Sequence, residues 1–106
     1  MSGKSRREQI EGMLRDGMED DGFLRYCLAM EYKTEGNSAQ AVTCFRELLQ
    51  HMPEYVPGYM QLGQLLNQLG EEDEAKKTYR EGISVARKKG DAHAEGEMSG
   101  FLAMLD

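Results

Sequence analysis

Residues 36–47 read GNSAQAVTCFRE, and residues 70–81 read GEEDEAKKTYRE. A shift of 34 residues places Ala41 on Ala75 and Phe45 on Tyr79, with a glycine before and Arg-Glu after them in both copies. The same shift also places Leu28 on Leu62. Self-similarity with a period of roughly 20 to 50 residues is typical of repeat proteins. The sequence therefore predicts a unit that occurs twice and packs on its neighbours.

Each unit is predicted to be two helices joined by a turn. In the second half of the first copy, apolar side chains recur with helical period, at Ala41, Val42, Phe45, Leu48, Leu49 and Met52. Gly36 suits the left-handed residue that ends a helix, and Asn37 can cap the next helix, with Gln40 in capping-box spacing. In the second copy Gly70 ends a helix, and acidic residues 71–74 begin the next one.

The ends of the chain continue the pattern in shifted register. Ile10, Leu14 and Met18 repeat the spacing of the second helix, and Met98, Ser99 and Leu102 repeat that of the first. We therefore expect about six helices and no sheet, with helices near 5–17, 22–34, 38–51, 56–68, 72–88 and 92–105. We expect eight repeat residues to be mostly buried in the core: Leu28, Tyr32, Ala41, Phe45, Leu62, Leu66, Ala75 and Tyr79.

These residues resemble the tetratricopeptide repeat, whose pattern is Trp-x2-Leu-Gly-x2-Tyr, then Ala-x3-Phe, then Pro. The first copy departs from the pattern at Arg25, and the second at Leu66 and Arg87. The matching residues are Leu28, Ala29, Tyr32, Ala41, Phe45 and Pro53 in the first copy, and Tyr59, Leu62, Gly63, Ala75 and Tyr79 in the second. The absent second proline suggests that the last repeat helix continues to about Lys89.

The resemblance implies an all-α stack of antiparallel helix hairpins in a right-handed superhelix. We expect one domain over residues 1–106. Its expected parts are an N-terminal packing helix, two repeats and a C-terminal capping helix, at 5–18, 22–55, 56–89 and 91–105 respectively.

Charge and composition exclude several classes of function. The net charge is −6, with 13 basic and 19 acidic residues, which argues against binding nucleic acid or an anionic membrane surface. Apolar runs are too short to span a bilayer, and no apolar stretch follows the basic residues at 4–7, as a signal peptide would need. We expect a cytoplasmic protein whose cysteines, Cys27 and Cys44, are free thiols.

The sequence shows no constellation that predicts catalysis. His51 and His93 stand in no nucleophile motif and have no metal-ligand spacing with the cysteines. Residues 16–22 fail as a calcium loop and are expected to be a polar turn. Gly96 and Gly100, on the last predicted helix, suggest either close packing or a smooth wall for a ligand. We therefore expect no enzyme activity, no cofactor and no metal.

The resemblance also implies that the first helix of each repeat lines a concave face. The side chains left over from packing there are aromatic, methionine, lysine or amide. We predict a binding surface for a partner's peptide or helix at Tyr26, Met30, Lys33, Met60, Gln61, Gln64 and Asn67. The carboxylate clamp of some tetratricopeptide co-chaperones is absent, because Tyr26, Met30 and Gln61 occupy its positions.

Two functions remain open at this point. The leading interpretation is a non-enzymatic scaffold module that binds a peptide or helix of another protein in this groove. The alternative is a self-assembly module that forms homo-oligomers, such as a weak homodimer, through apolar side chains of the terminal helices. Those side chains are Met13, Met18, Phe101, Met104 and Leu105.

Overall fold

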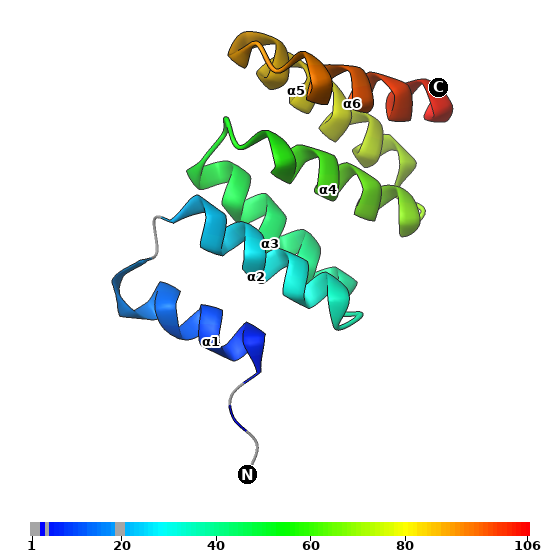
Figure 1. Ribbon diagram of the computed structural model, residues 1–106. Coiled ribbons are helices and arrows are strands. Elements are labelled where there is room, and N and C mark those ends of the chain that lie inside the picture. The colour runs from blue at the N-terminus through cyan, green and yellow to red at the C-terminus, as the bar shows by residue number, and fades with distance from the viewer. Residues whose placement is uncertain (1–2, 4, 19–20) are drawn as a thin grey trace. The chain divides into compact units, whose positions relative to one another are not determined.

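The computed structural model describes residue 3 and residues 5–18 and 21–106, and these form six α-helices and no strand (Figure 1). The all-α fold and the predicted number of helices are confirmed. The predicted bounds also hold for every helix after the first. The helices are α1 (Arg6–Met13), α2 (Gly22–Thr34), α3 (Ser38–His51), α4 (Val56–Gln68), α5 (Glu72–Lys89) and α6 (Ala92–Leu105).

The helices pack as two compact units, residues 1–51 and residues 52–106. In the first unit, α2 and α3 form a hairpin, and α1 packs on α2. In the second, α4 and α5 form a hairpin, and α6 packs on α5. One domain over residues 1–106 stays a prediction.

The turns that follow α2, α4 and α5 each contain a glycine, for the same physical reason. Gly36, Gly70 and Gly90 adopt φ angles of 82°, 82° and 74°, a left-handed conformation that costs least without a Cβ atom. After the first of them, the N–H of Asn37 donates to the carbonyl of Tyr32 at 2.9 Å. Equivalent bonds follow the other two glycines, which satisfies carbonyls that the helix ends leave unpaired.

The caps agree in part with the sequence. The Oδ1 atom of Asn37 accepts from the N–H of Gln40 at 3.2 Å, as expected. The side chain of Gln40 donates instead to Sγ of Cys44 at 3.9 Å. The prediction that the last repeat helix continues to Lys89 is confirmed.

The first helix is shorter than predicted. α1 ends at Met13, and the next residues, Leu14–Met18, form a wider turn in which Asp16 and Gly17 leave helical angles. Gly17 has φ of 116°, which side chains with a Cβ atom rarely adopt, so the helix cannot continue to residue 17. The predicted polar turn over residues 16–22 includes residues 19 and 20, which lie outside the described part of the chain.

The predicted core is confirmed except at two positions. Ala41, Phe45, Leu62, Leu66, Ala75 and Tyr79 are buried. Leu28 and Tyr32, on α2, are only half-buried. α1, which packs on α2, is eight residues long, and Ile10 is its only buried residue. A short helix with one buried apolar side chain leaves part of α2 exposed.

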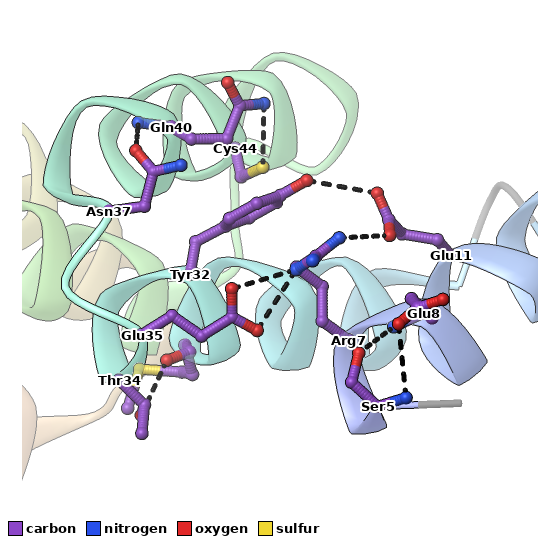
Figure 2. A network of polar contacts seen from close by, with 11 residues as sticks. Ser5, Arg7, Glu8, Glu11, Tyr32, Thr34, Glu35, Asn37, Gln40 and Cys44 are labelled. Atoms are coloured by element: carbon purple, nitrogen blue, oxygen red, sulfur yellow. Dashed lines mark hydrogen bonds and ion pairs between the residues drawn. The ribbon is translucent and has the colours of Figure 1, made fainter. Parts of the chain in front are cut away.

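Polar contacts supplement this small apolar contact between α1 and α2 (Figure 2). Nε of Arg7 lies 3.0 and 3.1 Å from the two carboxylate oxygens of Glu35. The same guanidinium pairs with Glu11 at 2.7 Å and lies 5.2 Å from the ring centre of Tyr32. The hydroxyl of Tyr32 donates to Glu11 at 3.0 Å. Pairs this exposed contribute about 0–1 kcal/mol each.

Phe45→Ala should destabilise the chain strongly. The Phe45 side chain is 0% exposed, and its ring meets Tyr26 edge-on at 6.2 Å between centroids. Removing it should cost about 3–5 kcal/mol in the free energy of unfolding, through lost apolar contact and a residual cavity. Phe23→Ala is the control, because Phe23 is 63% exposed. Equal denaturation midpoints for the two variants would contradict the assignment of the core.

Two glycines of the second unit mark close helix contacts. A Cβ atom added to Gly63 would lie 2.5 Å from Cε1 of Tyr79. One added to Gly82 would lie 2.6 Å from both Cβ of Tyr59 and Sδ of Met98. By contrast, a Cβ atom added to Gly96 or Gly100 meets nothing within 4 Å. The close-packing interpretation of these last two glycines is therefore wrong for the described part of the chain.

Alanine at Gly82 and alanine at Gly100 should have opposite effects on the stability of the chain. Gly82→Ala should lower the melting temperature, because Tyr59 or Met98 must move to make room for the added methyl group. Gly100→Ala adds a methyl group in open space and restores helix propensity, which should stabilise the chain by about 0.5–1 kcal/mol. Thermal denaturation of both variants beside the wild type measures the contrast, and effects of the same sign would refute it.

Candidate protein-binding site

The predicted binding residues fall in both units. Tyr26, Met30 and Lys33 are half-buried residues of α2. In α4, Met60, Gln61 and Gln64 are half-buried and Asn67 is exposed. Their union into one surface stays a prediction.

Within the second unit, the structure places two of these residues in one hollow. It has a volume of about 480 Å³ and lies between α4, α5 and α6. Met60 and Gln61 are not among its lining residues, which are Gln64, Asn67, Gln68, Tyr79, Phe101, Met104 and Leu105.

The hollow has a polar wall and an apolar wall. Three amide side chains on the last turns of α4 form the polar wall, at spacing i, i+3 and i+4, which places them on one helix face. The apolar wall comes mainly from α6, where Met104 is 82% exposed. The ring of Phe101 stacks on Tyr79 with 5.7 Å between centroids and 26° between planes. None of the lining residues carries a charge at neutral pH.

The position of α6 follows from the packing of its buried side. Met98 and Ala94 are buried, and Met98 lies where Gly82 leaves room for it. One turn later this packing places Phe101 against Tyr79. At the end of the helix, the Asp106 carboxylate pairs with Arg80 at 3.4 Å and Lys76 at 3.6 Å, which ties the C-terminal end of α6 to α5.

Some of the lining residues have other roles in the sequence-based prediction. The sequence predicts Tyr79 in the core, and it is only 2% exposed. It predicts Phe101, Met104 and Leu105 on a self-assembly face. The apolar stripe of the last helix is the sequence feature that could have indicated these residues. Because that helix is in shifted register relative to the repeat, the stripe does not show which residues of α4 it would meet.

Other chemistry-bearing side chains do not gather with this hollow. His93 is exposed and pairs with Glu97, four residues later on α6. Both cysteines are free, and burial raises the pKa of each thiol. No group of three potential metal ligands occurs among the described residues.

A family model for the tetratricopeptide repeat matches residues 24–50 and 56–89, more than half of the chain. The chain belongs to the tetratricopeptide repeat family. These repeats are in general protein–protein interaction modules, and their fold is generally a non-catalytic scaffold. Each match lies within one of the two repeats that the 34-residue period predicts, residues 22–55 and residues 56–89.

Relatives of this tetratricopeptide repeat chain occur in several bacteria. It is 31% identical over 99 residues to a TPR repeat-containing protein of Pseudomonas aeruginosa, covering 93% of both chains. A tetratricopeptide repeat domain protein from Salinibacter ruber, solved by NMR, is 36% identical with a TM-score of 0.78, covering 81% of this chain and 87% of that one. A protein from Bordetella parapertussis is 27% identical with a TM-score of 0.83, covering 97% and 89%.

Among the described residues, none of the helices combines the length and apolar character that a membrane span requires.

Alkaline pH should destabilise the repeat through its buried tyrosines. Burial raises the pKa of Tyr79 above its ordinary value, so the unfolded chain loses this proton at a lower pH than the folded chain. The contribution of Tyr79 to stability is thus fully present below about pH 10 and is lost as pH rises further. Urea unfolding between pH 9 and 11 should show falling stability. Tyr79→Phe should reduce that slope by up to about 1.4 kcal/mol per pH unit, and an unchanged slope would refute this origin.

Proposed function

We propose that this chain is a non-enzymatic interaction module, which binds a peptide segment of another protein with the hollow between α4, α5 and α6 as a principal contact. The observation that carries the proposal is the pairing of an amide wall with an apolar wall around about 480 Å³. Ligand sites commonly have volumes of about 300–1,000 Å³ and combine apolar lining with a few polar groups.

The chemistry of the two walls favours an extended peptide with an apolar anchor. Each amide of Gln64, Asn67 and Gln68 can both donate and accept hydrogen bonds, as a peptide backbone requires. The opposite wall offers an aromatic ring and the adaptable thioether of Met104 to an apolar side chain. Because the lining is uncharged, we expect recognition here to depend weakly on salt.

A peptide display selection against the full chain tests this proposal. Selected peptides should bind a Gln64→Ala, Met104→Ala double variant at least tenfold more weakly. Neither substitution touches the buried core, since Gln64 is half-buried and Met104 is 82% exposed. Gln50→Ala, at an exposed amide of α3, is the matched control and should bind as the wild type does. Peptides that bind all three proteins equally would exclude the hollow.

The remaining predicted contacts are separable in the same assay. We propose that Tyr26, Met30, Lys33, Met60 and Gln61 also contact the partner. Single alanine variants at each position test them independently of the hollow. A residue whose variant leaves affinity unchanged does not belong to the site.

Self-assembly through the last helix remains a second candidate, favoured by the exposure of Met104 and by the open space at Gly96 and Gly100. Exposed apolar and small residues on one helix allow two copies to approach. Solution mass between micromolar and millimolar concentration tests this candidate. A constant monomer mass would exclude it, whereas a dimer that Met104→Lys dissociates would support it.

A further inference from the structure

In the first unit, α1 occupies one face of α2 largely through charge. The carboxylates of Glu31 and Glu35 lie one helical turn apart on that face. Nε of Arg6 lies 2.9 Å from Oε1 of Glu31, and Arg7 makes the two-oxygen contact with Glu35. Two adjacent arginines of α1 thus reach the carboxylates of Glu31 in α2 and of Glu35, the residue that caps α2.

Apolar contact adds little specificity to this pairing. Ile10 is 5% exposed and is the sole buried residue of α1, whereas Met13 is 44% exposed. Tyr32 follows Glu31 in α2. Its ring is covered by the Arg7 guanidinium, and its hydroxyl donates to Glu11 (Figure 2). The contacts of α1 on this face thus come from two arginines, an apolar residue three positions later, and then a glutamate.

This face is different from the predicted groove side of α2. Tyr32 is two residues from Met30, which is a rotation of about 200° around the helix. The face also lies in the other unit from the hollow proposed above. A ligand on this face would therefore use none of the side chains that line the hollow.

We propose that the α2 face formed by Glu31, Tyr32 and Glu35 is a second interaction surface, which accepts an arginine-bearing helix of a partner protein in place of α1. Charge complementarity is the basis, because α1 itself shows which groups the face pairs with. An eight-residue helix has little stability when undocked. Its release is therefore a local event that leaves the α2–α3 hairpin in place.

A partner helix must compete with α1, which is joined to α2 by the chain itself. A segment joined by a short connection acts at an effective concentration on the order of 1 mM. A partner helix with the same contacts therefore binds the wild-type chain poorly. It binds well once α1 is undocked, and this difference can be measured.

A full-length Arg6→Glu, Arg7→Glu variant provides the undocked form, because its new carboxylates face Glu31 and Glu35. The probe is a fluorescently labelled peptide of residues 5–18, which carries both arginines. By anisotropy, this peptide should bind the variant at least tenfold more tightly than the wild type. Raising NaCl from about 0.05 M to about 0.5 M should weaken binding, since exposed ion pairs are screened. A control peptide with glutamine at both arginine positions should bind at least tenfold more weakly.

The Cys44 thiol reports whether α1 has left α2. Cys44 is buried, and it lies on the side of Tyr32 that also meets Glu11 of α1, to which the Tyr32 hydroxyl donates (Figure 2). In a Cys27→Ser background, Cys44 should react with a disulfide reagent several-fold faster in the undocked variant. Adding the unlabelled peptide should restore protection. Circular dichroism of the variant checks that the other helices remain folded.

A reciprocal charge exchange keeps the proposal testable if the double variant is unstable. A Glu35→Arg chain should bind a peptide with glutamate at the Arg7 position and should reject the unaltered peptide. Two results would overturn the proposal. One is an unchanged Cys44 rate after charge reversal, which would show that charge does not hold α1. The other is a faster rate without peptide binding, which would show that the exposed face is not an interaction surface.

Discussion

Tight packing of large side chains against small residues is the constraint on which the rest of the structure depends. Ala41 and Ala75 occupy the same repeat position and are fully buried. Gly63 and Gly82 leave no space for even a Cβ atom beside Tyr79, Tyr59 and Met98. A Cβ atom at Gly63 or Gly82 would force these neighbouring side chains to shift. The large core residues then fill the space beside each close contact, as dense packing requires.

The two units present surfaces of contrasting chemistry. The hollow of residues 52–106 is lined by amides and apolar side chains and carries no charge of its own. The α1-facing side of α2 in residues 1–51 carries carboxylates that arginines neutralise. Apolar and amide contacts change little with salt, whereas exposed ion pairs are screened over a Debye length of about 8 Å at physiological ionic strength. A small repeat chain of this family thus combines one salt-tolerant and one salt-sensitive binding surface in our proposals.

Part of the candidate site could be predicted from the repeat. The 34-residue period placed Gln64 and Asn67 outside the packed side of their helix, and both line the hollow. Tyr79 was predicted as a core residue, and its buried ring also lines the hollow. A sequence pattern that divides residues into buried and exposed does not describe a side chain with both roles. Phe101 and Met104 belong to a helix in shifted register, so the period could not indicate which α4 residues they would meet.

The sequence by itself determined the number of helices, nearly all their bounds and the turns at Gly36, Gly70 and Gly90. These features depend on side chains within a few residues, namely apolar period, capping groups and a missing Cβ atom. Only the tertiary structure decided that Leu28 and Tyr32 are half-buried and that space is open at Gly96 and Gly100. It also decided that Phe101 stacks on Tyr79. The exposure of a side chain and its ring contacts depend on which helices pack together and how far each helix extends. These contacts join residues that are far apart in the chain.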